Sequence, residues 1–372
     1  MSTVITGLGV VSPLGHSATE LTRRLRAGAR ATSTADGGVI IDPIPLDAVP
    51  AEARGRIGRA DRVCRLFVAA SFKAVDDAGL SLPWTNAERV GLSFGSGLGC
   101  LLSNAEFYEK VVEQGIAAAS PRVFAYTVSS AAAGEVSIAL GIHGPNVTSH
   151  MGLAAGVGAI GYGFDLIETD KADIVLAGGA DANGAALVAA LREMGLLKNA
   201  ETSRPFHDAV PGVWPSEGAA VAVLERADRA RARGARVWAR IDGYAAGFEP
   251  SLTERTPRID GIASTLGRAL AAGSRIVGEV GAVIASAHGT AVDACERAAL
   301  RAVLGAAEPQ MLTPKEALGE CFGASGALAV ALAAGVLEEP GTEPGKAVLI
   351  SSLCYSGSVA AMVLSGAAPP AR

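Results

Sequence analysis

The chain has 372 residues, 49% of them hydrophobic and 19% charged, so it holds enough apolar side chain for a large core or for two units. Its formal net charge of −5 argues against nucleic acid as a partner, because binding to a phosphate backbone needs a concentrated positive field. The first residues lack the basic and apolar segments of a secretory leader, and no run reaches the roughly 18 to 20 apolar residues of a membrane helix. We therefore expect a soluble, cytoplasmic protein.

The predicted elements begin with a short buried strand over residues 2–11, followed by a Ser-Pro-Leu-Gly turn. Ser17 and Glu20 have the spacing of a capping box, which predicts the start of a helix. Residues 30–57 contain proline, glycine and aspartate, and we expect them to form a loop. An apolar pattern with the period of a helix follows over residues 61–79 and ends in glycine.

A buried helix followed by a strand occurs twice in the sequence. In the first half, a Gly- and Ala-rich helix over 154–167 precedes a strand over 172–177, and in the second half a helix over 323–334 precedes a strand over 347–352. Because helices that are apolar on all sides are buried, these pairs predict two fused α/β halves that share a central layer of helices. The alternative is an ordinary α/β protein, which contains several such units without duplication. The join would fall near the basic segment 229–240.

Short segments in one order along the whole chain resemble a known family. They are Val4–Gly15, Gly95–Gly99, Gly144–Pro145, Ala177–Ala180, Ser203–Pro205, Ala287–Thr290, Lys315 and Gly323–Gly326. None is specific alone, but together they resemble the β-ketoacyl synthase family of the thiolase superfamily. The resemblance implies an α/β thiolase fold, with duplicated βαβ halves in a five-layer α-β-α-β-α sandwich that assembles as a dimer. We expect an N-terminal ketosynthase-like half over residues 1–235 and a C-terminal half over 236–372.

The nucleophile position of that family is altered in this chain. In active members, a cysteine at the N-terminus of the central helix takes the acyl chain from acyl carrier protein, and the helix dipole and backbone N–H groups activate the thiol and stabilise the oxyanion. Ungapped counting from Gly144–Pro145 forward, or from Ala177–Gly179 backward, puts that position at Leu153. A leucine side chain cannot carry an acyl group, so the resemblance implies no chain elongation at this site.

Other reactive positions of the family are altered as well, so we expect no catalytic residue. His288 matches the first of two family histidines, and without a nucleophile we interpret it as a hydrogen-bonded structural residue. Glu320 stands at the second histidine position, where a carboxylate would oppose a developing enolate anion. Lys315 matches the family's lysine, and its spacing allows an ion pair with Glu320. The family's Gly-Phe-Gly-Gly gate is replaced by Leu353–Ser358.

These losses make the chain most similar to chain length factors, the cysteine-free ketosynthase β-subunits of type II polyketide systems. The resemblance implies a heterodimer with an active ketosynthase, together with an acyl carrier protein that holds the growing chain while malonyl units condense. Many such subunits carry glutamine at the position of Leu153. The leucine argues against a decarboxylating role and favours a branch that makes polyene or reduced chains.

The same resemblance places a substrate tunnel at the dimer interface, where side chains of this subunit close the partner's tunnel and limit chain length. Counting from the turn at Gly95–Gly99 places the wall at Leu98, Leu101, Phe107, Val111 and Phe124. Ordinary core packing is the alternative role for each of them. The strand expected to pair across the interface comprises Asn146, Val147, Thr148, Ser149, His150, Met151 and Gly152.

A second hypothesis is an independent thiolase-fold acyltransferase with a relocated nucleophile. Cys321 is the candidate thiol and would lie near His288, although a buried apolar cysteine is the commoner role. Ser149 and His150 are adjacent, but adjacent side chains on a strand point apart. The five cysteines show neither a CxxC pair nor a metal-binding spacing, so we expect reduced thiols, no metal and no other cofactor. A third hypothesis is a self-associating homologue with no partner.

Overall fold

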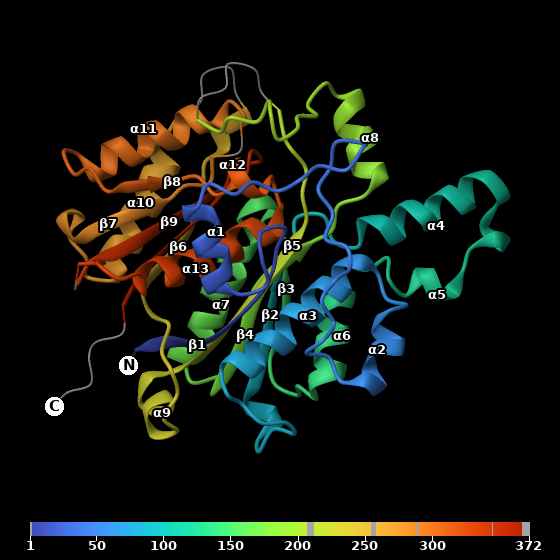
Figure 1. The fold of residues 1–372 in the computed structure, drawn as a ribbon, viewed down its shortest axis with the longest axis horizontal. Helices are drawn as coiled ribbons and strands as arrows, with labels where there is room; N and C mark the ends of the chain where they lie inside the picture. Colours follow the sequence, from blue (N-terminus) through green and yellow to red (C-terminus); the bar gives the residue numbers. More distant parts are fainter. Residues whose placement is uncertain (1, 207–211, 254–257, 288, 344, 367–372) are drawn as a thin grey trace.

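The computed structural model describes residues 2–206, 212–253, 258–287, 289–343 and 345–366. Strands in the first part of the chain are β1 (Thr3–Val11), β2 (Val90–Gly95), β3 (Asn146–Ser149), β4 (Ile174–Asp181) and β5 (Gly218–Arg226). Those in the second part are β6 (Ala239–Phe248), β7 (Val280–Ile284), β8 (Gln310–Leu312), β9 (Ala347–Leu353) and β10 (Ser358–Ser365). Together they form one continuous sheet in the order β3-β2-β4-β5-β1-β6-β10-β9-β7-β8 (Figure 1).

The two halves of this sheet have the same topology. In each half, the second strand runs parallel to the third and fourth, and the fifth strand runs antiparallel to the fourth and first. The halves meet where β1 pairs with β6 through two residue pairs, Val4 with Arg240 and Ile5 with Ala239. The repeated helix and strand seen in the sequence therefore correspond to a repeated sheet. The boundary between residues 235 and 236 remains a prediction.

Helices cover both outer faces of the sheet and fill the space between its halves. Their bounds are α1 (Ala18–Arg26), α2 (Ala51–Ile57), α3 (Arg62–Asp77), α4 (Leu101–Gln114), α5 (Pro121–Phe124), α6 (Ala131–Leu140), α7 (Ala155–Glu168), α8 (Ala185–Glu193), α9 (Ala227–Ala232), α10 (Asp260–Ala272), α11 (Val292–Leu304), α12 (Lys315–Leu318) and α13 (Gly323–Leu337). α3 and α6 pack outside the first half, α10 and α11 outside the second, and α7 and α13 lie between them. The expected five-layer α-β-α-β-α fold is confirmed. Across the described residues, no helix is long and apolar enough to cross a membrane.

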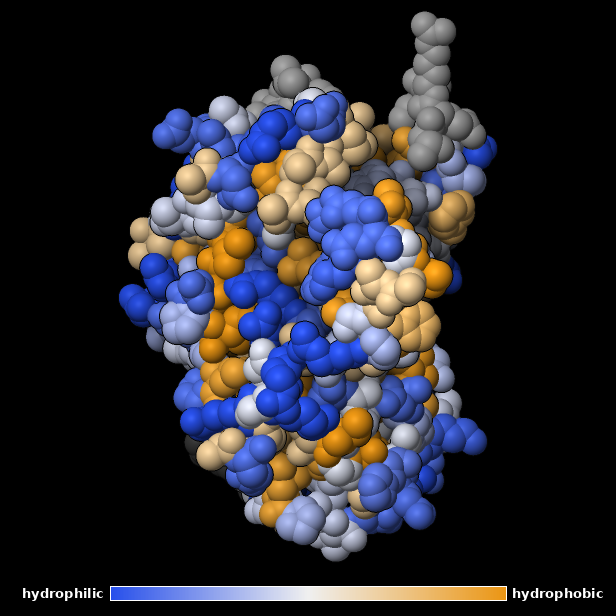
Figure 2. Space-filling view, turned by 90° about the vertical axis from the view of Figure 1, so that its right-hand side faces the viewer, coloured by the Kyte–Doolittle hydropathy of each residue, from blue (hydrophilic) through white to orange (hydrophobic). Residues whose placement is uncertain are grey.

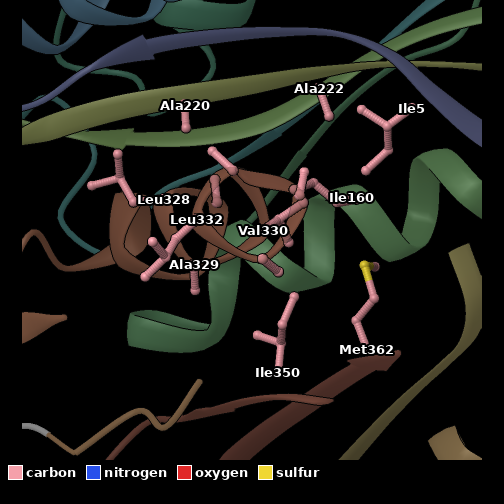
Figure 3. Close-up of a cluster of buried hydrophobic side chains, with 14 of the residues drawn as sticks. Ile5, Ile160, Ala220, Ala222, Leu328, Ala329, Val330, Leu332, Ile350 and Met362 are labelled. Carbon is pink, nitrogen blue, oxygen red and sulfur yellow. The ribbon is translucent and has the colours of Figure 1, made fainter. Parts of the chain in front are cut away.

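Helix α13 of the central layer is apolar on every side, as its sequence predicts, whereas α7 has one exposed edge at Tyr162 and Asp165. All of α13 from Gly323 to Val336 is buried. In Figure 3, Leu328 and Val330 of α13 lie between β5, which carries Ala220, and the strand that carries Ile350. Small residues allow close approach between the two central helices, because a Cβ at Gly156 would lie 2.5 Å from the carbonyl oxygen of Gly323. The first turns of α7 and α13 are therefore held directly against each other.

One short helix lies where we expected only loop. α2 occupies the end of the segment 30–57. Pro50 precedes its first residue, and a proline at a helix start sacrifices no intrahelical hydrogen bond. Ile57 at its end is fully buried and anchors the turn to the core beside α3. Burial of one side chain therefore outweighs the loop-like composition of the segment.

A buried carboxylate joins the two halves near the start of α13. Asp181, the last residue of β4, is fully buried. Its Oδ1 accepts hydrogen bonds from Ser96 Oγ and from the N–H of Leu98 at 3.1 Å. Its Oδ2 accepts from the N–H of Gly97 at 2.7 Å and from the N–H of Gly323 at 2.6 Å. One side chain thus fixes the turn after β2 to the first turn of α13.

We predict that Asp181→Asn lowers the free energy of unfolding at neutral pH by roughly 2–5 kcal/mol, because the ionised carboxylate accepts four hydrogen bonds there and an amide leaves about two of these donors without an acceptor. Burial raises the pKa of Asp181 from 3.8 to about 6, against the lowering effect of its hydrogen bonds. An acid whose pKa is higher in the folded chain than in the unfolded chain stabilises the fold at any pH below its ordinary pKa. This stabilisation is lost as the pH rises through the raised pKa. The difference in unfolding free energy between wild type and variant should therefore shrink as the pH rises from 3.8 to about 6.

Urea unfolding of both proteins at about pH 4 and about pH 7 measures this difference. A difference that does not depend on pH, or that grows as the pH rises, would contradict the prediction.

Candidate functional site

Leu153 lies at the entrance to the central helix α7, in a short turn formed by Gly152–Ala154. Its side chain is 4% exposed. The apolar side chains that pack with it come from separate parts of the chain and include Leu98, Leu191, Val213, Phe322 and Cys354. The position that ungapped counting assigns to the nucleophile is therefore at the N-terminus of a buried helix, within a cluster of apolar side chains.

The turn before Leu153 is held tightly against the end of β9. Gly152 has a φ of +56°, and a Cβ at this position would lie 2.4 Å from Sγ of Cys354. Only glycine is compatible with both this backbone and this contact. Ser352 Oγ donates a hydrogen bond of 3.4 Å to the carbonyl oxygen of Leu153. The place of Leu153 is thus fixed from β9 as well as from α7.

The altered gate segment Leu353–Ser358 adjoins this turn. Leu353 and Cys354 are buried, whereas the side chain of Tyr355 is exposed. The N–H of Cys354 donates to the carbonyl oxygen of Ser358 at 2.8 Å, which closes a tight turn between β9 and β10. Cys354, not an aromatic residue, therefore provides the contact nearest to Gly152.

Lys315 and Glu320 form a buried ion pair. Lys315 Nζ lies 2.7 Å from Glu320 Oε2, and the two side chains are 8% and 3% exposed. The contact is electrostatic, because neither atom makes a hydrogen bond of ordinary geometry within the described residues. The other oxygen of Glu320 accepts from the N–H of Phe322 at 2.8 Å and from Ser325 Oγ at 2.7 Å. A carboxylate with these partners offers no proton donor to an enolate oxygen.

Cys321 has the environment of an unreactive thiol. It is buried, and its Sγ donates to the carbonyl oxygen of Glu217 at 3.4 Å. Burial raises the pKa of the Cys321 thiol to about 12, so the thiolate is scarce at neutral pH. His288, the other group considered for a relocated nucleophile, lies outside the described residues.

Ser149 and His150 do not form a nucleophile and base. Ser149 Oγ is buried and makes no hydrogen bond within the described part of the chain. His150 is exposed. A serine nucleophile requires a base within hydrogen-bonding distance of its hydroxyl, and this pair lacks that contact.

The residues assigned to a tunnel wall fall into two groups. Leu101, Phe107 and Val111 are half-buried on α4, a helix with no fully buried residue. The ring of Phe107 lies 5.6 Å from that of Phe124, which is 58% exposed. In Figure 1 the α4 and α5 region projects from the body of the molecule. Leu98 lies apart from this group, because it packs with the cluster around Leu153.

The strand assigned to a dimer interface is at one end of the sheet. β3 pairs with β2, and within the described residues nothing pairs with its other edge. Each residue from Asn146 to Gly152 keeps some exposure. Figure 2 faces the side on which α4 projects and shows hydrophobic residues gathered in patches among hydrophilic ones. Exposed apolar residues on α4, α5, α6 and their connections are Tyr108, Val112, Ile116, Phe124, Val128 and Ile138.

Sequence reasoning missed Asp181 and Phe322 as residues that shape this region, and it named Cys354 only as part of the altered gate segment. An acidic residue at the end of an otherwise apolar strand was a usable signal for Asp181, because a buried carboxylate must find donors. Phe322 adopts φ +52° and ψ −123°, which no sequence pattern predicts for a phenylalanine. The contact of Cys354 with Gly152 joins residues about two hundred positions apart and left no local signal.

Comparison with known proteins places these observations in a family. Residues 2–230 match the model of the β-ketoacyl synthase N-terminal domain, and residues 238–344 match that of the C-terminal domain. The tetracenomycin polyketide synthase ketoacyl synthase alpha subunit of Streptomyces glaucescens is 30% identical over 363 residues, which cover 90% of this chain and 84% of the relative. Nodulation protein E of Rhizobium leguminosarum bv. trifolii is 33% identical over 340 residues, which cover 87% of this chain and 83% of the relative.

Solved structures give the same result. The ishigamide ketosynthase/chain length factor has a TM-score of 0.86 and 27% identity and covers 99% of both chains. A hexaketide-bound ketosynthase in complex with its type II polyketide acyl-carrier protein has a TM-score of 0.84 at 20% identity, over 98% of this chain and 99% of the other, and so supports the fold alone. With both domain models matched in order and relatives aligned over most of their length, the chain belongs to the β-ketoacyl synthase family.

Proposed function

We propose that this chain is a non-catalytic chain length factor. It would form a cytoplasmic heterodimer with an active ketosynthase and shape the end of the acyl tunnel, while malonyl units condense on acyl carrier protein into a polyketide of the polyene or reduced type. The observation that carries the proposal is Leu153, which is 4% exposed in an apolar cluster at the nucleophile position. No acyl group can attach there, so elongation must take place on another chain.

The charges near this position support the proposal. An enolate that develops beside Glu320 would meet a second negative charge, whereas an active family member offers a histidine there. Lys315 does not compensate, because its ammonium group lies against Glu320 at 2.7 Å. The opposite charges of Lys315 and Glu320 neutralise each other inside the protein, as in an ion pair with a structural role.

The surface supports a partner on the β3 side. An edge strand presents unpaired N–H and C=O groups that readily pair with another strand. Ile138, on the helix α6 that packs against β3, is 69% exposed, and Val112 on the projecting helix α4 is 83% exposed; exposed apolar patches commonly mark protein interfaces. A partner that covered this side would bury α4, whose side chains are nowhere fully buried within this chain.

The relatives support the kind of partner and substrate. One solved relative is a ketosynthase/chain length factor, and another is a ketosynthase in complex with its acyl-carrier protein. A third relative is named as an alpha subunit of a polyketide synthase. By analogy, we assign this chain an alpha-type ketosynthase as partner and an acyl carrier protein as the source of the growing chain.

The alternative is an independent thiolase-fold acyltransferase that uses a relocated nucleophile. Its best candidate is Cys321, which the fold places after Glu320 and beside the start of α13. The raised pKa and the burial of this thiol count against it. The two hypotheses differ in one measurable property, namely covalent acylation of this chain.

We predict that the purified chain forms no acyl adduct when incubated with an acyl carrier thioester and does not extend malonyl units. Co-expressed with the ketosynthase of its own gene neighbourhood, it should copurify with that protein and be required for its elongation activity. Intact-mass spectrometry of this chain and product analysis by chromatography measure the two outcomes. An acyl adduct on this chain alone would favour the acyltransferase, and full elongation by the ketosynthase without it would refute the proposal.

We predict that Phe107→Ala lengthens the product by at least one two-carbon unit in the reconstituted complex, because removing the ring opens space beside Phe124. Mass spectrometry of the released products measures the change. Phe248→Ala is the matched control: it removes a phenylalanine ring that is 57% exposed at the end of β6, in the other half of the sheet. An unchanged product distribution for Phe107→Ala, or the same change in both variants, counts against the tunnel assignment.

We predict that Ile138→Glu weakens the complex with the ketosynthase at least tenfold, because it puts a charge into an apolar contact beside β3. Ile276→Glu is the control, since Ile276 is also 69% exposed but precedes β7 near the opposite end of the sheet. Biolayer interferometry with immobilised ketosynthase measures both affinities, and thermal melting shows whether each variant is folded. Equal affinities for the two folded variants would be evidence against an interface on the β3 side.

A further inference from the structure

Leu153 packs with side chains from three other segments of the chain. Leu98 comes from the turn after β2, Leu153 from the turn before α7, Phe322 from the residue before α13, and Cys354 from the end of β9. We call these four residues the plug. Leu153, Phe322 and Cys354 are 4%, 5% and 3% exposed and Leu98 is half-buried, so little of the plug is open to solvent. Loss of a nucleophile alone would not require this packing, because an empty site could remain open.

The backbone at Phe322 is held in an unfavourable conformation. Its φ of +52° and ψ of −123° lie in a region that residues other than glycine rarely adopt. Its N–H donates to Glu320 Oε1 at 2.8 Å, and Glu320 is in turn held by Lys315 and Ser325. The next residue, Gly323, is fixed by Asp181. The hydrogen bonds on both sides of Phe322 therefore maintain a conformation in which its ring packs into the plug.

We infer that the plug seals the nucleophile position of this chain against thioester substrates. A carrier-bound acyl chain that approached Leu153 would have to displace Phe322 and Cys354, which belong to the same packed cluster. The former site is thus closed by packing in addition to lacking a reactive group. This inference rests on the proposed function in one respect only: in a heterodimer, it leaves the partner's site as the single entry for the growing chain.

The test is chemical access to a thiol placed at the site. The probe is iodoacetamide, applied to the isolated chain at neutral pH, with labelling followed by peptide mass spectrometry. We expect the thiol of Leu153→Cys to react at least one hundredfold more slowly than that of Val112→Cys, because position 112 is 83% exposed. Adding Phe322→Gly to Leu153→Cys should raise the rate at least tenfold, since glycine accepts the backbone conformation and removes the ring. Labelling of Leu153→Cys within threefold of Val112→Cys would overturn the inference.

The native cysteines provide an internal control for folding. Cys64 and Cys321 are buried, so labelling at either of them reports unfolding of a variant. If Phe322→Gly unfolds the chain by this criterion, Leu98→Ala replaces it and opens the plug from the other side. No acceleration in a folded double variant would show that these side chains do not close the site. Because no partner and no substrate take part, the outcome is independent of whether the chain acts as a chain length factor.

Discussion

The four hydrogen bonds to Asp181 are the interaction on which the site depends most. They tie the turn that carries Leu98 to the first N–H of α13, and α13 lies between the two halves of the sheet. Phe322 directly precedes that N–H, so its position follows from the same carboxylate. Leu153 is packed between these two points. The predicted nucleophile position therefore carries an apolar side chain held in place by packing.

At the start of α13, the chain's own carboxylates occupy helix N–H groups that could otherwise bind an anion. The first turn of a helix presents unpaired N–H groups that attract anions, a property that active sites use. At the start of α13, the N–H of Gly323 is already bound by Asp181 and that of Phe322 by Glu320. Both donors are occupied by the chain's own carboxylates, and Lys315 balances Glu320. The region therefore favours a closed, charge-balanced core over the binding of a substrate anion.

Much of the fold was predictable from the sequence, because its central helices are largely apolar and the family motifs occur in order. The substitution at Leu153 and the spacing of Lys315 and Glu320 were also visible, since they depend on alignment and on neighbouring residues. The backbone of Phe322 and the contact between Gly152 and Cys354 were not. Such features arise only when segments distant in sequence are packed together, and no local periodicity encodes them.

The β3 side of the molecule leaves apolar side chains exposed to water, whereas the cluster around Leu153 is buried. A chain that needed only to be stable would protect the edge of β3 with charge or proline and would not leave Val112 and Ile138 in water. Here the strand ends an extended sheet, and the aromatic residues of α4 pack on one another instead of on the core. Apolar surface of this kind gains free energy only when another surface covers it. The remaining function should therefore lie on the β3 side, because that is where this chain alone leaves its packing incomplete.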